Sequence, residues 1–261
     1  MPRWVLPILF LVSGCKAPPD APIQLDALCA WMFAHFDDDD PRNMRAGAEN
    51  LDVWLGENLD ATLEGYTVNN LSPSDVQNLP LDNPSVDSIV GAAVGHVSPY
   101  GVLSMADPLV VEDQTQVFPD SFDAHQRTFL TDPTCFVDES CDVVRTENEV
   151  ESSYALGLKV STHGRADYRW VDLGHGNLAL VHRTFLLEPA DTSFAWLQIN
   201  AQYFIGVMLP QDDGTTRRVS ATWISAIVGA SPVPKATALN LIIKSMQSDS
   251  TDLDTWLDDN R

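Results

Sequence analysis

Apolar residues recur at the spacing of an α-helix in the first part of the chain. They lie three or four positions apart between residues 25 and 36, and again between residues 44 and 59, which predicts two amphipathic helices with packing faces. Ser72 and Pro73 fit a further helix start, because Ser caps the first turn and Pro suits its first position. The small apolar residues of 85–105 predict another helix, one that packs closely against its neighbours.

From about His125 the apolar pattern changes from helical spacing to alternation. Alternating residues have one buried face, as β-strands do, and turns such as that at residues 212–214 favour antiparallel neighbours. Several strands are apolar in part on both faces, which indicates a sheet that is curved around something or covered by helices. Gly229 to Pro234 then break the chain, and helical spacing from Lys235 predicts a closing helix. The alternating segments are 154–160, 168–170, 178–187, 199–209 and 219–227.

The first residues have the layout of a secretory signal. Arg3 supplies a positive charge, Trp4 to Val12 form a short apolar stretch, and small residues lead directly into Cys15. The stretch is much shorter than the roughly 20 residues of a membrane-spanning helix, so it predicts a removable signal. The motif from Val12 to Cys15 resembles the bacterial lipobox, which implies cleavage before Cys15 and lipid on its sulfur. An ordinary signal peptide that contains a cysteine is the alternative.

Four segments follow from these patterns and from the lipobox resemblance. They are a signal peptide (1–14), the lipidated Cys15 with a proline-rich tether (15–22), a helical region (23–112), and an antiparallel sheet with a C-terminal helix (113–261). The predicted fold class is α+β, with N-terminal helices followed by a curved antiparallel sheet that the C-terminal helix closes. At about 3.1 Å per residue the tether reaches only about 20 Å, so the folded part is expected close to the membrane. Lipoproteins that stay in the inner membrane of enterobacteria carry Asp after the lipidated cysteine, so Lys16 at that position favours the outer membrane of the cell envelope, with the leaflet left open.

The charge of the chain excludes one class of partner. It carries 37 acidic and 15 basic residues, a formal net charge of −22, and loss of Arg3 with the signal leaves 14 basic residues and −23. Nucleic acid requires a basic surface, so no nucleic-acid partner is expected, and anionic lipid head groups should repel the folded part.

The remaining cysteines predict one structural bond and no metal site. Cys135 and Cys141 are close enough in sequence for a loop disulfide in an oxidising envelope. Cys29 lies on the apolar face of a predicted helix, where a buried, inert thiol is expected. No histidine has ligand spacing from the cysteine pair, so a metal site is not expected there. The acidic run Asp37 to Asp40 lacks the Gly and Glu of a calcium-binding EF-hand loop and is interpreted as a solvated connection.

The C-terminal part resembles the START-like, or helix-grip, domains. The resemblance covers about residues 113–261 and rests on the order of elements: a long antiparallel sheet, the strand from Trp223 to Gly229, the prolines Pro232 and Pro234, and the helix of 236–246. It implies a C-terminal helix that lies across a curved sheet and covers a cavity for a lipid or other apolar ligand. The whole chain also looks like lipoproteins of myxobacteria and related groups, a likeness that implies a location and no activity.

These features favour a binding protein over an enzyme. The chain lacks the familiar catalytic and cofactor-binding motifs, so no catalytic residue and no cofactor is expected. The favoured hypothesis is a membrane-anchored module that binds a lipid or other apolar ligand, with the membrane as partner through the N-terminal lipid. The candidate ligand-binding residues are Trp170, His182, Arg183, Tyr203 and Trp223.

Two alternatives stay open. The first is a structural or protein-interaction lipoprotein with a filled core and no ligand. The second is a hydrolase or isomerase that uses the same cavity, for which only His182 and Arg183 supply polar groups in mid-strand. A buried Arg183 requires a carboxylate or a ligand anion as its partner, and a structural ion pair is favoured.

Overall fold

A computed structural model describes residues 20–82, 84–154, 157–229 and 231–261. The predicted signal peptide, Cys15 and most of the tether lie outside the described residues, so their assignments stay predictions. No helix in the described ranges is both long enough and apolar enough to cross a membrane.

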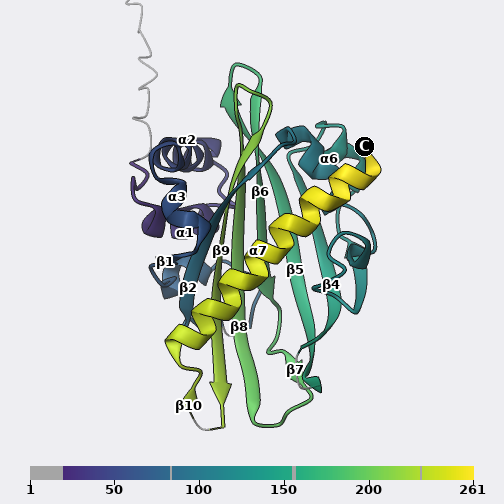
Figure 1. Ribbon diagram of the computed structural model, residues 1–261. Helices are drawn as coiled ribbons and strands as arrows, with labels where there is room; N and C mark the ends of the chain where they lie inside the picture. Colours follow the sequence, from purple (N-terminus) through teal and green to yellow (C-terminus); the bar gives the residue numbers. More distant parts are fainter. Residues whose placement is uncertain (1–19, 83, 155–156, 230) are drawn as a thin grey trace, which may run out of the picture.

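One antiparallel sheet forms the centre of the molecule. The strands follow the order β1-β2-β9-β8-β6-β5-β4-β3, with β10 paired to β9 and β7 paired to β5, and the long strands run the length of the molecule (Figure 1). This confirms the large antiparallel sheet that the alternating pattern predicts. The strands are β1 Tyr66–Val68, β2 Val90–Ser98, β3 Ala124–Phe129, β4 Val143–Ser153, β5 Lys159–Gly174, β6 Asn177–Leu186, β7 Asp191–Thr192, β8 Leu197–Pro210, β9 Thr216–Val228 and β10 Ser231–Pro232.

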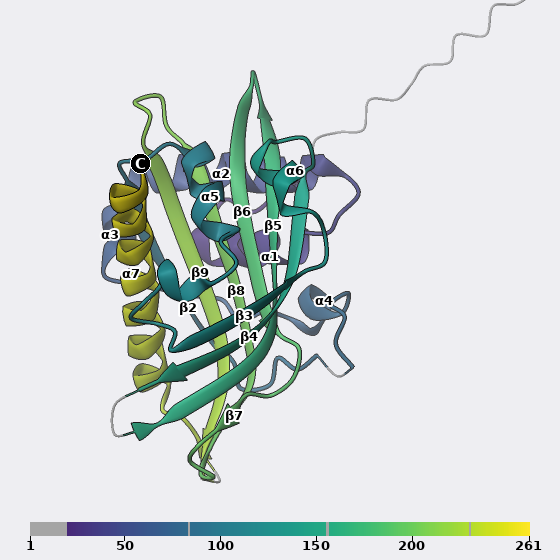
Figure 2. The same cartoon turned by 90° about the vertical axis from the view of Figure 1, so that its right-hand side faces the viewer.

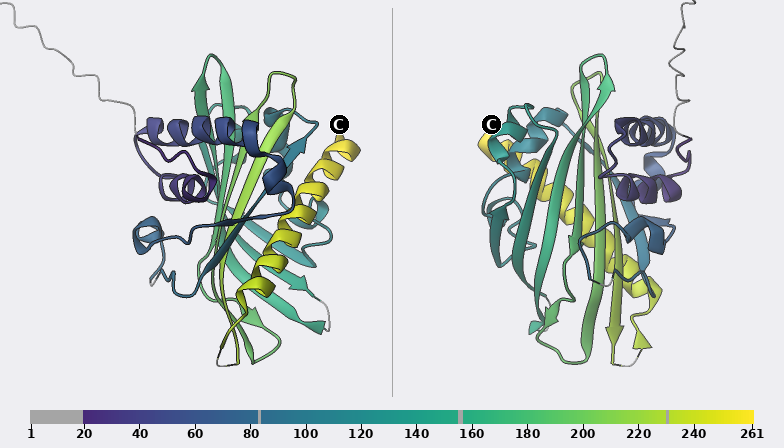
Figure 3. Two further views of the ribbon diagram at one scale, coloured as in Figure 1. Left: turned by 60° about the vertical axis from the view of Figure 1, so that its left-hand side comes forward. Right: turned by 180° about the vertical axis from the view of Figure 1, so that it is seen from behind.

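Helices cover both faces of the sheet. The C-terminal helix α7 crosses one face diagonally (Figure 1), and α5 and α6 lie near its C-terminal end (Figure 2). The N-terminal helices α1 and α2 lie against the other face (Figure 3). The predicted fold class, α+β with a curved antiparallel sheet closed by a C-terminal helix, is therefore confirmed. The helices are α1 Leu25–Ala34, α2 Pro41–Asn58, α3 Asp60–Leu63, α4 Pro73–Val76, α5 Ala106–Leu109, α6 Pro133–Val137 and α7 Lys235–Asn260, with short 3-10 turns η1 Val102–Met105 and η2 Gln114–Gln116.

The prediction of a helix across 85–105 is wrong, because the middle of that segment, Val90–Ser98, is strand β2. Its glycines are required by close packing of the strand, Gly91 against the neighbouring strand β9 and Gly95 against helix α3. A Cβ on Gly91 would lie 2.4 Å from the indole of Trp223, and one on Gly95 would lie 2.0 Å from the hydroxyl of Thr62. Strand β2 pairs with β9 along its whole length, so the region 23–112 contributes strands to the same sheet as 113–261.

Alternation along the strands separates two sides of the sheet. One side packs against α1 and α2 in a large hydrophobic cluster that includes Phe33, Tyr203 and Trp223. The opposite side, called here the α7 face, carries two smaller clusters. One joins Trp170, Leu180 and Met208 to the C-terminal half of α7, and the other joins β2 to its N-terminal half. The α7 face is the one to which the helix-grip resemblance assigns a ligand cavity.

Candidate ligand site on the α7 face

The sheet divides the five predicted ligand residues between its two sides. Trp170 belongs to the cluster on the α7 face, and His182 lies on the same face because it pairs with Tyr168 of that cluster. Tyr203 and Trp223 pair with each other and pack edge-on against Phe33 of α1 on the opposite side. These residues therefore do not line one cavity.

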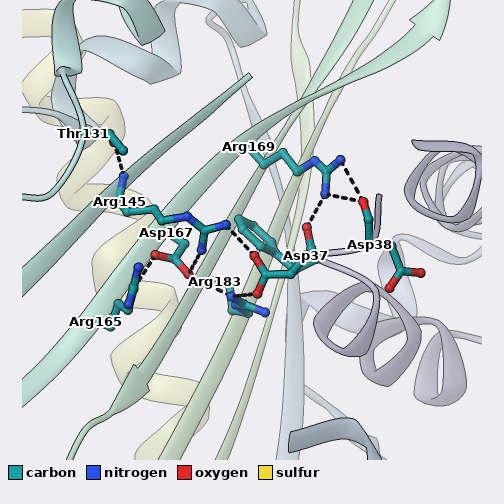
Figure 4. Close-up of polar contacts among 9 residues, drawn as sticks. Asp37, Asp38, Thr131, Arg145, Arg165, Asp167, Arg169 and Arg183 are labelled. Carbon is teal, nitrogen blue, oxygen red and sulfur yellow. Dashed lines mark hydrogen bonds and ion pairs between the residues drawn. The ribbon is translucent and has the colours of Figure 1, made fainter. Parts of the chain in front are cut away.

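Arg183 also lies on the α1 side, in a cluster of ion pairs (Figure 4). Its Nη2 donates to Asp167 at 2.8 Å and to Asp37 at 2.5 Å, and its guanidinium stacks over the ring of Phe36 at 4.3 Å. Asp167 is 0% exposed and also accepts from Arg145 and from Arg165, each at 3.0 Å. The structural ion pair favoured for Arg183 is present.

The acidic connection between α1 and α2 closes this cluster. Burial alone would raise the pKa of Asp37, but Arg183 and Arg145 hold it below its ordinary value. Arg169 donates to the backbone carbonyls of Phe36 and Asp38. The run from Asp37 stays partly exposed, as the sequence predicts, and it also binds the N-terminal helices to the sheet. The described residues hold no group of three or more His, Cys, Asp or Glu side chains arranged to bind a metal ion.

A polar zone occupies the middle of the α7 face. It follows the row in which His182, Gly206 and Ser220 are direct neighbours across β6, β8 and β9. The His182 ring lies between Tyr168, at a centroid distance of 4.4 Å, and Phe204, at 5.0 Å. Its Nε2 atom is buried and has no hydrogen-bond partner. Burial, with smaller contributions from Arg127 and Arg218, lowers the pKa of His182 to about 3, so the ring is neutral near pH 7.

Arg218 lies beside this row on β9 and is 6% exposed. It pairs with Met208 and His96 across the sheet, which places it on the α7 face. Its Nε and Nη1 atoms are buried without a hydrogen-bond partner. Asp254 of α7 lies 3.6 Å from Nη1, which is too far for a hydrogen bond. Burial lowers the pKa of Arg218 to about 10, with partial compensation from Asp254 and Asp249.

Helix α7 supplies the carboxylates around Arg218. Asp254 accepts from His96 Nε2 and from Ser98 Oγ, each at 2.6 Å, and these contacts fasten the helix to β2. Asp249, five residues earlier, accepts from Ser121 Oγ at 2.7 Å. Burial raises the pKa of Asp249 to about 6, so this carboxyl becomes protonated more readily than an exposed one.

Arg127 of β3 closes the far side of the zone and has its donors engaged. It donates to Asn148 Oδ1 at 2.9 Å, to Tyr168 Oη at 3.2 Å, and to the carbonyls of Leu109 and Val111 at 2.7 and 2.8 Å. Arg127 therefore holds the segment after α5 against the sheet and orients Tyr168. In contrast, Arg218 retains buried donors that no protein group uses.

Two hollows lie at the edges of the sheet. One, of about 310 Å³, lies between η2 and the C-terminal half of α7 and is lined by Val117, Asp252 and Trp256 among others. The second, of about 260 Å³, lies along β3, β4 and β5, and its residues Gln126 and Glu149 alternate to the side opposite the α7 face. Both are open to solvent, so neither is the enclosed volume that the cavity hypothesis expects.

Three cysteines lie within the described residues, and each has the state that the sequence predicts. Cys135 and Cys141 form the predicted disulfide in the loop that holds α6, with Cα atoms 5.3 Å apart. Cys29 is a buried free thiol, and burial raises its pKa to about 12, as expected for an inert side chain.

Sequence reasoning missed Arg218, Arg127 and Asp249. The signal for Arg218 was available, because Arg217 and Arg218 are consecutive in a strand and alternation must turn one of them to each side. Nothing in the sequence indicated that the Asp249 side chain of α7 would be largely removed from solvent.

Comparisons with known proteins find similar solved structures but no matching sequence family. No protein-family profile matches the chain, and no curated protein is significantly similar in sequence. Among solved structures, the chain is similar to a START superfamily protein from Mycobacterium smegmatis, at 9% identity and a TM-score of 0.42 over 66% of this chain and 99% of that one. A STAR-related lipid transfer protein fragment from Xanthomonas axonopodis matches at 12% identity and 0.42, over 67% and 97%. An aromatase/cyclase from Streptomyces matches at 11% and 0.40, over 66% and 93%. At these scores no conclusion about activity rests on the likeness.

Proposed function

We propose that this protein is a membrane-anchored envelope lipoprotein whose folded part binds a lipid or other apolar ligand on the α7 face, without catalysing a reaction. One observation carries the ligand-binding part. His182, Thr184, Phe204 and Ser220 stay only partly buried in the middle of this face, although a helix crosses it and hydrophobic clusters lie on either side.

The apolar surroundings of the zone suit such a ligand. Leu180 and Met208 continue from it into one cluster, and Val94 with Met246 of α7 continues into the other. An elongated apolar molecule in the polar zone would remove the partly exposed ring of Phe204 from water, at about 25 cal/mol for each Å² of apolar surface buried. The open hollow beside Asp252 offers the ligand a route of entry. Ser121 donates to Asp249 of α7, which links the segment before β3 to this helix.

A dye-binding experiment tests the ligand site. The probe is N-phenyl-1-naphthylamine, an uncharged dye that fluoresces in apolar surroundings, added to the full chain carrying Cys15→Ala so that no acyl chain competes. Thr184→Trp fills the polar zone, because Thr184 lies beside Phe204 on the α7 face, and should weaken dye binding at least tenfold. The matched control Thr128→Trp lies on exposed strand surface on the opposite side and should leave binding unchanged. Absence of dye binding to the unblocked chain, or equal binding by both tryptophan variants, would reject the site.

The membrane-anchored part rests on the lipobox resemblance of Val12 to Cys15. In bacteria that process lipoproteins, the natural chain should incorporate labelled palmitate and fractionate with membranes. Cys15→Ala should incorporate none and keep its signal peptide. A Cys15→Ala chain that still incorporates the label would contradict the anchoring proposal while leaving the ligand site untouched.

A further inference from the structure

Arg218 and His182 point to the polar end of the ligand. Both present buried nitrogen atoms without partners on the α7 face, in neighbouring rows of the sheet: Nε and Nη1 of Arg218 and Nε2 of His182. Buried donors in folded proteins are almost always satisfied, and an unsatisfied one costs about 1–3 kcal/mol. Two unsatisfied side chains that influence each other electrostatically are therefore best explained by a missing acceptor that belongs to a bound molecule.

The charges around Arg218 favour an acceptor that is an anion. Asp254 already accepts short hydrogen bonds from His96 and Ser98 and approaches Arg218 only to 3.6 Å. Asp249 is engaged by Ser121 and is the carboxyl most easily neutralised. Arg218 is thus a buried guanidinium with weak compensation, and a guanidinium recognises carboxylate and related oxyanions with paired N–H donors.

Aromatic rings of the α7 face add an apolar surface beside that anion position. Tyr168 and Phe204 lie on either side of the His182 ring, and the Phe204 ring extends over Gly206, where an added Cβ would lie 3.2 Å from it. A ligand whose anionic group reaches Arg218 would lay its apolar body along these rings.

We infer that the ligand of this site is an amphipathic acid, an apolar or aromatic molecule with one carboxylate or similar anionic group that Arg218 binds and His182 hydrogen-bonds. This inference rests on the proposed ligand-binding function and narrows it. It excludes neutral lipids such as sterols or acylglycerols as the preferred occupants. The ligand's acid group and the Arg218 side chain satisfy each other beneath α7.

Two dyes that differ by one anionic group test this inference. 8-Anilinonaphthalene-1-sulfonate is the same arylamine as N-phenyl-1-naphthylamine with a sulfonate added. In the full chain carrying Cys15→Ala the sulfonated dye should bind at least about tenfold more tightly than the neutral one, as expected for a charge-assisted hydrogen bond. Arg218→Met should abolish that preference while changing the affinity for the neutral dye less than threefold.

Arg217→Met is the matched control. Arg217 is the preceding residue of β9 but lies on the opposite side of the sheet, where it pairs with Asp52 at 2.7 Å, so its loss should preserve the preference for the sulfonated dye. His182→Phe retains the ring between Tyr168 and Phe204 and removes Nε2, and should weaken sulfonate binding severalfold without affecting the neutral dye. Near-ultraviolet circular dichroism verifies that each variant is folded.

The outcomes separate the inference from the function on which it rests. If neither dye binds the folded chain, the proposed ligand site itself fails. If both dyes bind with equal affinity, or if Arg218→Met and His182→Phe both keep the preference, the site binds apolar molecules but the amphipathic-acid inference is overturned. Should Arg218→Met not fold, the dye preference of the natural sequence and its response to His182→Phe still decide.

Discussion

Asp167 carries the ion-pair cluster beneath the N-terminal helices, and its replacement offers a direct measure of what that cluster contributes. Asp167→Asn keeps the size and shape of the side chain but removes its charge. The carboxylate is 0% exposed and accepts from Arg145, Arg165 and Arg183 at 2.8–3.0 Å (Figure 4). An amide has only one oxygen that can accept from these guanidiniums. Its NH2 group would point N–H donors at the N–H donors of the remaining arginines.

The size of the effect follows from the burial of Arg183. This side chain is 3% exposed, so water cannot replace the lost carboxylate. Removing one partner of a buried ion pair typically costs about 3–5 kcal/mol. Asp37 remains as a second, partly exposed partner of Arg183 and Arg145, which favours the lower end, about 3 kcal/mol. For a chain of this size such a loss lowers the melting temperature by roughly 6–12 °C.

The assay is urea unfolding followed by circular dichroism, which avoids the ionic strength of guanidinium salts. Asp172→Asn serves as the matched control, because Asp172 also pairs with an arginine, Arg45, but is 66% exposed. An exposed pair contributes less than about 1 kcal/mol. Equal losses for Asp167→Asn and Asp172→Asn would refute the reasoning, since burial is what distinguishes the two pairs.

Two further predictions concern single side chains. The pKa of Asp249 is raised from 3.8 to about 6 in the folded protein, so the folded state binds the extra proton and its stability falls as the pH rises from about 4 to about 6. The natural chain should lose up to about 3 kcal/mol relative to Asp249→Asn between pH 4 and pH 7 in urea unfolding, and a constant difference would contradict the shift. Gly95→Ala should cost about 1–3 kcal/mol by overpacking, because its Cβ would meet Thr62. Thr62→Ala should recover part of that loss in the double variant, and no recovery would contradict this contact as the cause.

Much of the fold could be predicted because its periodicities are local properties of the chain. The alternating segments 168–170, 178–187, 199–209 and 219–227 became β5, β6, β8 and β9, whereas only the last two residues of 154–160 belong to β5. The helical spacing of 25–36 and 44–59 became α1 and α2. Strand β2 could not be predicted in this way. Its small residues are explained by Trp223 and Thr62, which are distant in sequence, and a run of small residues has no clear period of either kind.

The candidate site was less predictable, because the side of a strand residue depends on register. His182 and Arg183 are consecutive, so alternation sends them to opposite sides, but which of them meets α7 depends on strands that pair far away in sequence. The same limit applied to Tyr203 and Trp223, whose burial is explained by α1 rather than by a cavity.

The contrast between Arg183 and Arg218 is the strongest reason to expect a ligand. Both are buried arginines of the same sheet in a chain with 37 acidic residues, so a carboxylate partner was available to either. Arg183 has two carboxylates at 2.5 and 2.8 Å and one unsatisfied nitrogen atom, Nε, whereas Arg218 has one carboxylate at 3.6 Å and two unsatisfied nitrogen atoms. If stability alone decided the residue at 218, an apolar side chain would be the better choice there, because an undercompensated buried charge costs free energy. An anion that binds and leaves gives Arg218 a partner only in the bound state, which explains both the buried charge and its incomplete pairing.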